Sequence, residues 1–167
     1  LMINIPTLYF GYLIILLSII GFGYLSTKIL SIRLSLGELG LSGILFMTVL
    51  SYITNLFVSH GFIHNSIFLV IGLFCFLLIS KKKLFRKKIK LILLVSSALF
   101  IGILMYKTHD DFFYYHFQYT ISLIEFKKIF GVGNLEHGFR TPSSIFYLNS
   151  LFYLPIIEKS LINSGAI

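Results

Sequence analysis

Runs of apolar residues, each close to the length needed to cross a bilayer, alternate with short polar stretches along the first two thirds of the chain. A membrane-crossing helix needs about 20 largely apolar residues, and the stretches that meet or approach this are 7–26, 39–59, 66–80 and 89–106. The third is short, but the lysines after it can extend it by directing their charged ends toward water. We therefore predict four membrane-spanning helices within residues 1–106.

A fifth apolar stretch, 143–157, follows a longer polar segment. Thr141 is a candidate N-cap for it, and Pro142 is a candidate first helical residue. Because its length is marginal for a crossing, it fits either an interfacial helix or an incomplete span. We expect 143–167 to be the truncated start of a further membrane helix, and the chain to be the N-terminal part of a longer protein.

The segment 107–142 between these stretches has the spacing of an amphipathic helix. If 111–130 is helical, polar and apolar side chains separate onto two faces, namely Asp111, Tyr115, Gln118, Ser122 and Glu125 against Phe113, Phe117, Thr120 and Ile124. Such a helix lies at the membrane surface, and the Gly131-Val132-Gly133-Asn134 breaker would end it. The predicted fold is all-α: a polytopic transmembrane helix bundle of four to five spans plus one amphipathic interfacial helix.

Composition supports an integral membrane protein. Hydrophobic residues make up 57% of the 167 positions and charged residues 12%, which is outside the usual balance of a soluble domain. The net charge is +8, but seven of the fourteen Lys and Arg fall within 81–90, between two apolar runs. That position is typical of a topology signal, so we expect membrane lipids as partners and no nucleic acid.

The basic segments also predict an orientation. The loop 81–90 should remain cytoplasmic, as should Lys28 and Arg33 between the first two spans. Both loops then place 107–142 on the non-cytoplasmic side. The single cysteine, Cys75, lies in an apolar run and allows no internal disulfide.

The candidate chemistry lies in a polar cluster directly after the fourth apolar run, where Asp110 and Asp111 stand side by side. One reading is structural, since carboxylates at the start of a helix cap it and favour its positive end. The other is functional: one carboxylate acts as general base toward an acceptor hydroxyl, or binds a divalent cation, while the other orients it. Neither reading excludes the other.

Several neighbouring residues are candidates for substrate binding. His116 and Tyr115 could contact a sugar or serve only as interfacial residues, and Arg140 could pair with a phosphate or anchor the interface. No zinc site is expected here, because the loop lacks cysteine and histidines at HxxxH or HExxH spacing. No role is assigned to His60 or His64.

These residues resemble the N-terminal part of GT-C type membrane glycosyltransferases, and more closely a poorly characterised group of bacterial membrane proteins of this general type. The group has a D-x-x-x-YH-x-Q stretch, then G-x-GNL and a later SS pair. The first pattern is matched here by Asp111, Tyr115, His116 and Gln118, and the others by 131–135 and Ser143-Ser144. The resemblance covers roughly 105–155.

The resemblance implies transfer of a sugar from a polyprenyl-phosphate carrier at the outer face of a bacterial inner membrane, in cell-envelope glycan assembly. It implies a catalytic Asp111, with Asp110 as the other candidate, and substrate contacts from His116, Tyr115, Gln118 and Arg140. No cofactor is expected apart from the divalent cation considered above. The alternatives are a noncatalytic membrane subunit and a transporter or flippase of lipid-linked sugars, which would need ionisable residues inside its spans.

Overall fold

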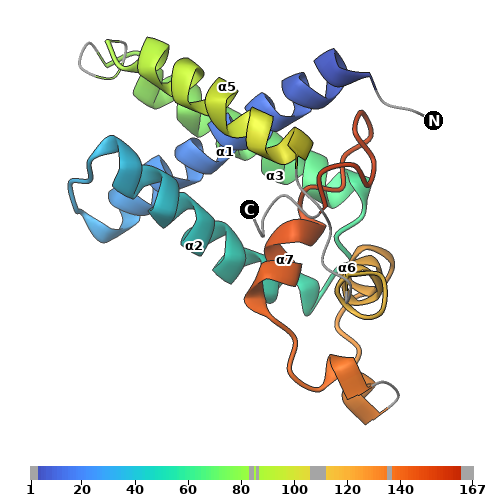
Figure 1. Cartoon of the computed structure of the whole chain (residues 1–167). Helices are drawn as coiled ribbons and strands as arrows, with labels where there is room; N and C mark the ends of the chain where they lie inside the picture. The colour runs from blue at the N-terminus through green and yellow to red at the C-terminus, as the bar shows by residue number, and fades with distance from the viewer. Residues whose placement is uncertain (1–3, 83–84, 86, 106–111, 135–136, 163–167) are drawn as a thin grey trace. The chain divides into compact units, whose positions relative to one another are not determined.

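The computed structural model describes residues 4–82, 85, 87–105, 112–134 and 137–162 (Figure 1). Within these ranges the regular structure is helical, and the only β pairing is an isolated bridge between Leu154 and Glu158. The predicted all-α fold class is confirmed. The chain divides into two compact units, unit 1 with residues 1–47 and 67–106 and unit 2 with residues 48–66 and 107–167.

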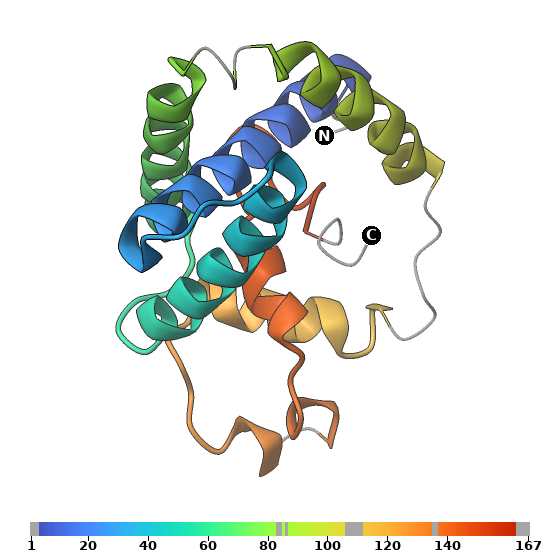
Figure 2. The same cartoon turned by 90° about the vertical axis from the view of Figure 1, so that its left-hand side faces the viewer.

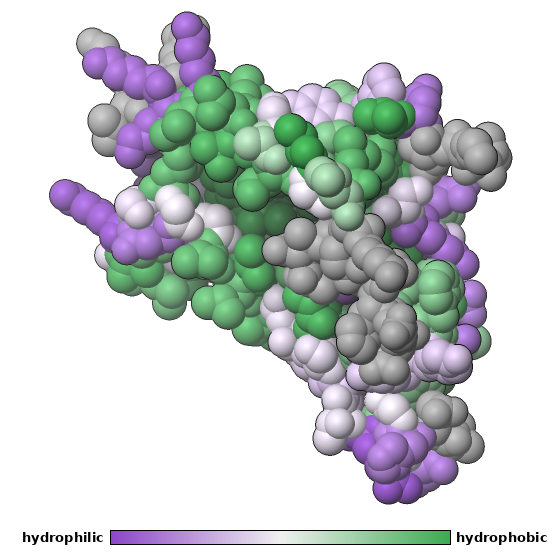
Figure 3. All heavy atoms as spheres, in the orientation of Figure 1, coloured by the Kyte–Doolittle hydropathy of each residue, from purple (hydrophilic) through white to green (hydrophobic). Residues whose placement is uncertain are grey.

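Three helices are long and apolar enough to cross a membrane: α1 (Ile5–Leu30), α2 (Leu36–Asn55) and α3 (Phe62–Ser80). The fourth predicted span forms a shorter apolar helix of 17 residues, α5 (Ile89–Met105). Large apolar side chains cover the outer faces of these helices, as the green surface in Figure 3 shows. Apolar surface of this extent is favourable in lipid and unfavourable in water, and the chain is a membrane protein.

Local signals set the ends of α1. The Asn4 side chain accepts a hydrogen bond from the Thr7 amide at 2.9 Å, and Pro6 occupies the first turn, where its missing N–H has no intrahelical partner to lose. At the other end, Ser31 takes a left-handed conformation with φ 55°, and its N–H bonds to the Thr27 carbonyl. These caps make α1 longer than the apolar run 7–26 alone predicted.

Unit 1 is assembled around α1, which runs past α2, α3 and α5 (Figure 2). Its contacts with α2 and α3 use positions without side chains. A Cβ on Gly21 would collide with the Gly72 carbonyl of α3, and one on Gly43 would collide with the Ile19 carbonyl of α1. Small residues allow this close approach of backbones, which is the usual basis of helix association in lipid.

A pair of glycines one turn apart on α2 tests this packing. Gly43→Ala is expected to destabilise the protein by about 1–3 kcal/mol, because the added methyl would overlap backbone atoms of Ile19 and Gly23. Gly40→Ala is the matched control, since no atom lies within 4 Å of the added methyl, and alanine's higher helix propensity favours it by up to about 1 kcal/mol. Thermal unfolding in detergent distinguishes the two, and an equal loss in both variants would refute the close approach.

The fourth helix joins unit 1 through aromatic contacts. The Tyr9 hydroxyl hydrogen-bonds the Ser97 hydroxyl of α5 at 2.6 Å, and the Tyr9 and Phe100 rings meet edge to face with centroids 5.0 Å apart. A second apolar cluster packs α1, α2, α3 and α5 together. It is made of Ile20, Leu39, Phe76, Ile79, Phe85 and Ile92, all buried.

Unit 2 contains α6 (His116–Glu125), two short 3₁₀ turns (Val132–Asn134 and His137–Phe139) and α7 (Ser144–Ser150). The helix predicted over 111–130 is therefore shorter among the described residues. Its buried face is Tyr119, Thr120, Leu123 and Ile124, whereas Phe113, expected on that face, is exposed. The helix ends early because carbonyls of its last turn are occupied from outside: His60 N–H and the Asn55 amide donate to Leu123 O, and Asn55 also donates to Phe126 O.

The expectation for 143–157 is also corrected. The N-cap is Ser143, whose hydroxyl accepts from the Ile145 amide, so neither Thr141 nor Pro142 plays the predicted part. The helix stops after seven residues, and Pro155, which disfavours helix in the residue before it, stands in the turns that follow. Seven residues cannot cross a bilayer; this segment is folded into unit 2 with Ile157, Leu161 and Ile162 fully buried.

Candidate functional site

The two candidate carboxylates, Asp110 and Asp111, lie outside the described residues, which resume at Phe112. Phe112 is buried and packs against Phe113 and Phe117, with ring centroids 5.2 and 5.6 Å away. The aromatic residues directly after the carboxylates therefore anchor the start of this segment to α6.

Two of the predicted substrate-binding residues, which are consecutive in the sequence, lie at the start of α6. Tyr115 and His116 are half-buried, their rings meet at 90° with centroids 4.2 Å apart, and both face Phe146 of α7. The Tyr115 side chain also covers Gly138, where a Cβ would lie 2.8 Å from the Tyr115 Cβ. In the sequence, Tyr115 follows Asp111 by four residues and His116 follows it by five.

The other two predicted residues lie apart from this pair. Gln118 is exposed on α6, whereas its neighbours Tyr119 and Thr120 are buried. Arg140 is exposed after the second 3₁₀ turn, and its Nε donates to the Gly133 carbonyl at 3.3 Å. A Cβ at Gly133 would stand 3.0 Å from Arg140 Cα, so a larger residue there would require Arg140 to shift by a few tenths of an ångström.

A buried polar network that the sequence analysis did not identify lies at the centre of unit 2. His60, Asn65 and Ser150 are each at most 1% exposed. His60 Nδ1 lies 2.6 Å from Ser150 Oγ, and Ser150 Oγ also donates to the Tyr147 carbonyl at 2.8 Å. A serine hydroxyl has one proton, and the carbonyl can only accept, so His60 is the donor to Ser150 and carries its proton on Nδ1.

Asn65 connects three segments of the same network. Its side-chain amide lies 2.7 Å from the His60 carbonyl, 2.8 Å from the Ser150 carbonyl and 2.9 Å from the Tyr153 carbonyl. Its carbonyl oxygen accepts from His64 Nδ1 at 2.9 Å. One asparagine thus fixes the loop before α3 to the end of α7 and the turn that follows it.

A second polar group joins α6 to α7 through Lys128. Its ammonium donates to the Tyr147 hydroxyl at 2.6 Å and to the Tyr119 hydroxyl at 3.2 Å, and the two hydroxyls are 3.3 Å apart. Tyr147 also stacks on Tyr52 with centroids 3.8 Å apart. Burial raises the pKa of Tyr119 to about 12 and also raises the pKa of Tyr147, so both phenols stay protonated and accept the lysine's hydrogen bonds.

Burial holds His60 in its neutral form. Its pKa is lowered from 6.5 to about 3, mainly because the charged imidazolium would lose its hydration and secondarily because His64 lies beside it. A neutral imidazole that is buried and hydrogen-bonded to Ser150 supports the structure of unit 2.

The depressed pKa of His60 predicts acid sensitivity. Above pH 6.5 the ring is neutral in both folded and unfolded chains, but below it only the unfolded chain gains the proton, so stability falls as the pH drops toward 3. The expected loss at pH 5 is about 2 kcal/mol. Thermal unfolding in detergent at pH 7.5 and pH 5 measures this loss of stability. The loss should be smaller in His60→Gln, whereas the control His137→Gln, at an exposed position, should show the same loss as wild type. A drop unchanged in His60→Gln would contradict the assignment.

The described residues contain no group of three His, Cys, Asp or Glu side chains placed to hold a metal. His60 and His64 do have the HxxxH spacing. Their rings are instead stacked face to face, with centroids 4.7 Å apart and an interplanar angle of 15°, and their Nδ1 atoms point to Ser150 and Asn65. Two ring nitrogens arranged this way do not converge on one ion.

The spacing of these two histidines was the one sequence signal that could have revealed the network. Their partners were not readable in the same way, because Ser150 lies 90 positions from His60 and Ser150 and Tyr153 lie 85 and 88 positions from Asn65. Buried polar groups in a membrane protein require partners, but the sequence does not say which.

Comparison with known proteins yields one family. The model of a family described as a domain of unknown function (DUF8201) matches residues 7–166. No curated protein and no solved structure matches the chain. Since the family match extends over nearly the whole length of the sequence, the chain belongs to the DUF8201 family.

Proposed function

We propose that this DUF8201 protein is a membrane glycosyltransferase of the GT-C type, which transfers a sugar from a polyprenyl-phosphate carrier at the non-cytoplasmic face of a bacterial inner membrane, in cell-envelope glycan assembly. The observation that carries the proposal is the position of Asp110 and Asp111 in the sequence. These are two of only six acidic residues in the chain, and they stand between the last apolar helix, α5, and the packed α6–α7 pair.

The α6–α7 pair supports the proposal because it is a packed element that follows the two aspartates in the sequence. Tyr119, Leu123, Phe146 and Tyr147 form a buried cluster, with Tyr115 packed against it. Catalytic groups must be held close to their productive geometry. The two aspartates directly precede Phe112, the first residue of this packed segment, in the sequence.

In the proposed reaction, the carboxylate of Asp111 removes the proton from an acceptor hydroxyl, and Asp110 is the other candidate for this role. The acceptor oxygen then bonds to the anomeric carbon of the donor sugar as the bond from that carbon to the carrier phosphate breaks. The phosphate leaves with the electron pair, and Arg140 stabilises its charge. Tyr115, His116 and Gln118 contact the sugars through stacking and hydrogen bonds.

The two alternatives are distinguishable. A flippase of lipid-linked sugars needs ionisable groups inside its spans, whereas Lys28 and Glu38 lie near the ends of α1 and α2 and Lys90 lies at the start of α5. A noncatalytic subunit needs no carboxylate at all. It predicts that the aspartates are replaceable as long as the protein folds.

The test replaces the native gene by one encoding Asp110→Asn and Asp111→Asn together, with Glu125→Gln as matched control. Glu125 is an exposed carboxylate at the end of α6, so the control removes a charge from the same segment. The proposal expects the double variant to accumulate lipid-linked sugar and lose the glycan product at an unchanged amount of protein in the membrane, while the control behaves as wild type. Normal product from the double variant would favour the noncatalytic subunit.

A further inference from the structure

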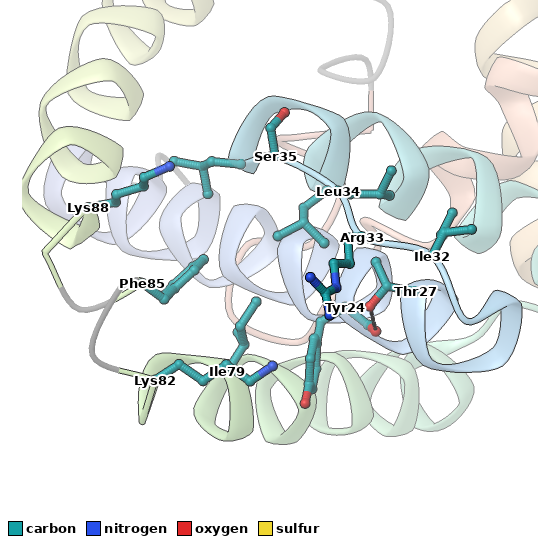
Figure 4. A pocket seen from close by; sticks show the side chains of 12 residues that line it. Tyr24, Thr27, Ile32, Arg33, Leu34, Ser35, Ile79, Lys82, Phe85 and Lys88 are labelled. Carbon is teal, nitrogen blue, oxygen red and sulfur yellow. Dashed lines mark hydrogen bonds between the residues drawn. The ribbon is translucent and has the colours of Figure 1, made fainter.

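Unit 1 contains a pocket of about 390 Å³ that plays no part in the proposed transfer. It opens between the C-terminal end of α1, the turn leading into α2, the C-terminal end of α3 and the segment that follows α3 (Figure 4). Its lining is divided by chemistry into a cationic rim and an apolar floor. The rim is Arg33, Lys82 and Lys88, and the floor includes Leu39, Ile79 and Phe85.

The cations of the rim come from three different segments and have little opposing charge. The Arg33 side chain lies near Tyr24 (Figure 4), and Lys82 Nζ stands 4.9 Å from the centroid of the Tyr24 ring. Residues 1–106 contain nine Lys and Arg but one acidic residue, Glu38. The Glu38 carboxylate already accepts the Ser35 N–H at 2.6 Å, where it caps α2.

The floor of the pocket is continuous with the interior of unit 1. Leu39, Ile79 and Phe85 are 5%, 6% and 6% exposed and belong to the apolar cluster that holds the four helices together. A small inorganic anion would pair with the cations of the rim but would leave the apolar floor in contact with water. An occupant that matches both parts carries a phosphate at one end and hydrocarbon at the other.

We propose that this pocket binds an anionic phospholipid, with the headgroup phosphate paired to Arg33 and Lys82, Lys88 as a further cation across the opening, and the start of an acyl chain against Phe85 and Ile79. Guanidinium and ammonium groups are the usual partners of phosphate oxygens. Basic pockets between membrane helices on the cytoplasmic side are suited to such headgroups, and the basic segments of this chain predict that same side for the pocket. The proposal goes beyond the proposed function and does not depend on it.

The test measures lipid retained by the purified full chain in neutral detergent, by native mass spectrometry, after addition of phosphatidylglycerol or phosphatidylcholine at equal concentrations. The wild-type protein is expected to retain phosphatidylglycerol preferentially. The variant Arg33→Gln/Lys82→Gln/Lys88→Gln should retain at least about tenfold less, since each cation near a lipid surface contributes about 1 kcal/mol.

The matched control is Lys81→Gln/Lys87→Gln/Lys90→Gln, which removes the same charge from exposed lysines that do not line the pocket. It should stay within about twofold of wild type, since its charges lie outside the pocket. If both triple variants lose the same amount of retained phosphatidylglycerol, the binding depends on overall positive charge and the proposal is overturned. Equal retention of the two lipids by the wild-type protein would also overturn it. Inorganic phosphate that displaces the lipid at millimolar concentration would mean a site for the free anion instead.

Thermal unfolding of each variant shows whether it is folded. If the triple pocket variant is not, the single variants Arg33→Gln and Lys82→Gln replace it, each with an expected loss of at least about threefold. Retention unchanged in both single variants would then contradict the proposed phosphate contacts.

Discussion

Replacement of Asn65 by aspartate is expected to unfold the polar centre of unit 2, at a loss of roughly 2–4 kcal/mol. The Asn65 amide faces the carbonyls of His60, Ser150 and Tyr153 within 2.9 Å. An ionised aspartate has no proton to donate, so its oxygens would face the three backbone carbonyls, which also only accept hydrogen bonds. A protonated aspartate has one proton and could donate to only one of these carbonyls. Either form leaves buried carbonyls without this donor.

Asn134→Asp is the matched control for that change, because Asn134 is exposed in a 3₁₀ turn of the same unit. We expect it to alter stability by no more than about 0.5 kcal/mol. Hydrogen exchange of the α6 and α7 amides, together with the thermal midpoint in detergent, measures both variants. Unchanged protection of α7 in Asn65→Asp would show that Asn65 does not hold this unit together.

Asp111→Asn is expected to lower the rate of sugar transfer by about 10²–10⁴-fold, which is the usual contribution of a positioned general base. The change keeps the shape of the side chain and removes its basicity. It should therefore leave the amount of folded protein unchanged, and the main effect should fall on kcat rather than KM. Initial rates with a polyprenyl-phosphate-linked sugar at saturating concentration measure the effect.

Asp110→Asn identifies which carboxylate acts. If Asp111 is the base and Asp110 orients it, Asp110→Asn should lose less activity than Asp111→Asn, and Glu125→Gln should lose none. The reverse order would transfer the role of base to Asp110. Full activity in both single variants and in the double variant would mean that Asp110 and Asp111 are not catalytic and that only their structural role as helix caps remains.

The membrane helices were predictable because lipid imposes a simple condition on sequence. A span must be apolar over its whole length, and the runs starting at 7, 39 and 66 fall within or largely overlap α1, α2 and α3. Their ends were less predictable. Asn4 and Ser31 lengthen α1 through hydrogen bonds and backbone conformation that the apolar run does not encode.

The interior of unit 2 was not predictable in the same way. The early end of α6 depends on donors from His60 and Asn55, which lie more than 60 positions away in sequence. The seven-residue length of α7 depends on burial of the turns after it, where Pro155 stands. Periodicity describes one helix at a time, whereas these features depend on which segments meet.

The candidate site stays a prediction. Tyr115 and His116 are neighbours in sequence, and their ring contact and the Arg140 hydrogen bond to Gly133 bear on the packing of unit 2 and not on substrate binding. Lys128 with its two tyrosines, and His60 with Asn65, were missed because each residue has an ordinary role when taken alone. A lysine at an interface and a histidine in a short loop become informative only when their burial is known.

The most direct test of the account is sugar transfer by the purified protein in proteoliposomes, with radiolabelled polyprenyl-phosphate-linked hexoses as donors and extracted membrane glycolipids as acceptors. We expect label in the acceptor fraction and release of polyprenyl phosphate, both lost in the Asp110→Asn/Asp111→Asn variant and kept in Glu125→Gln. Label that stays on the carrier with the wild-type protein, or that is transferred equally by the double variant, would contradict it.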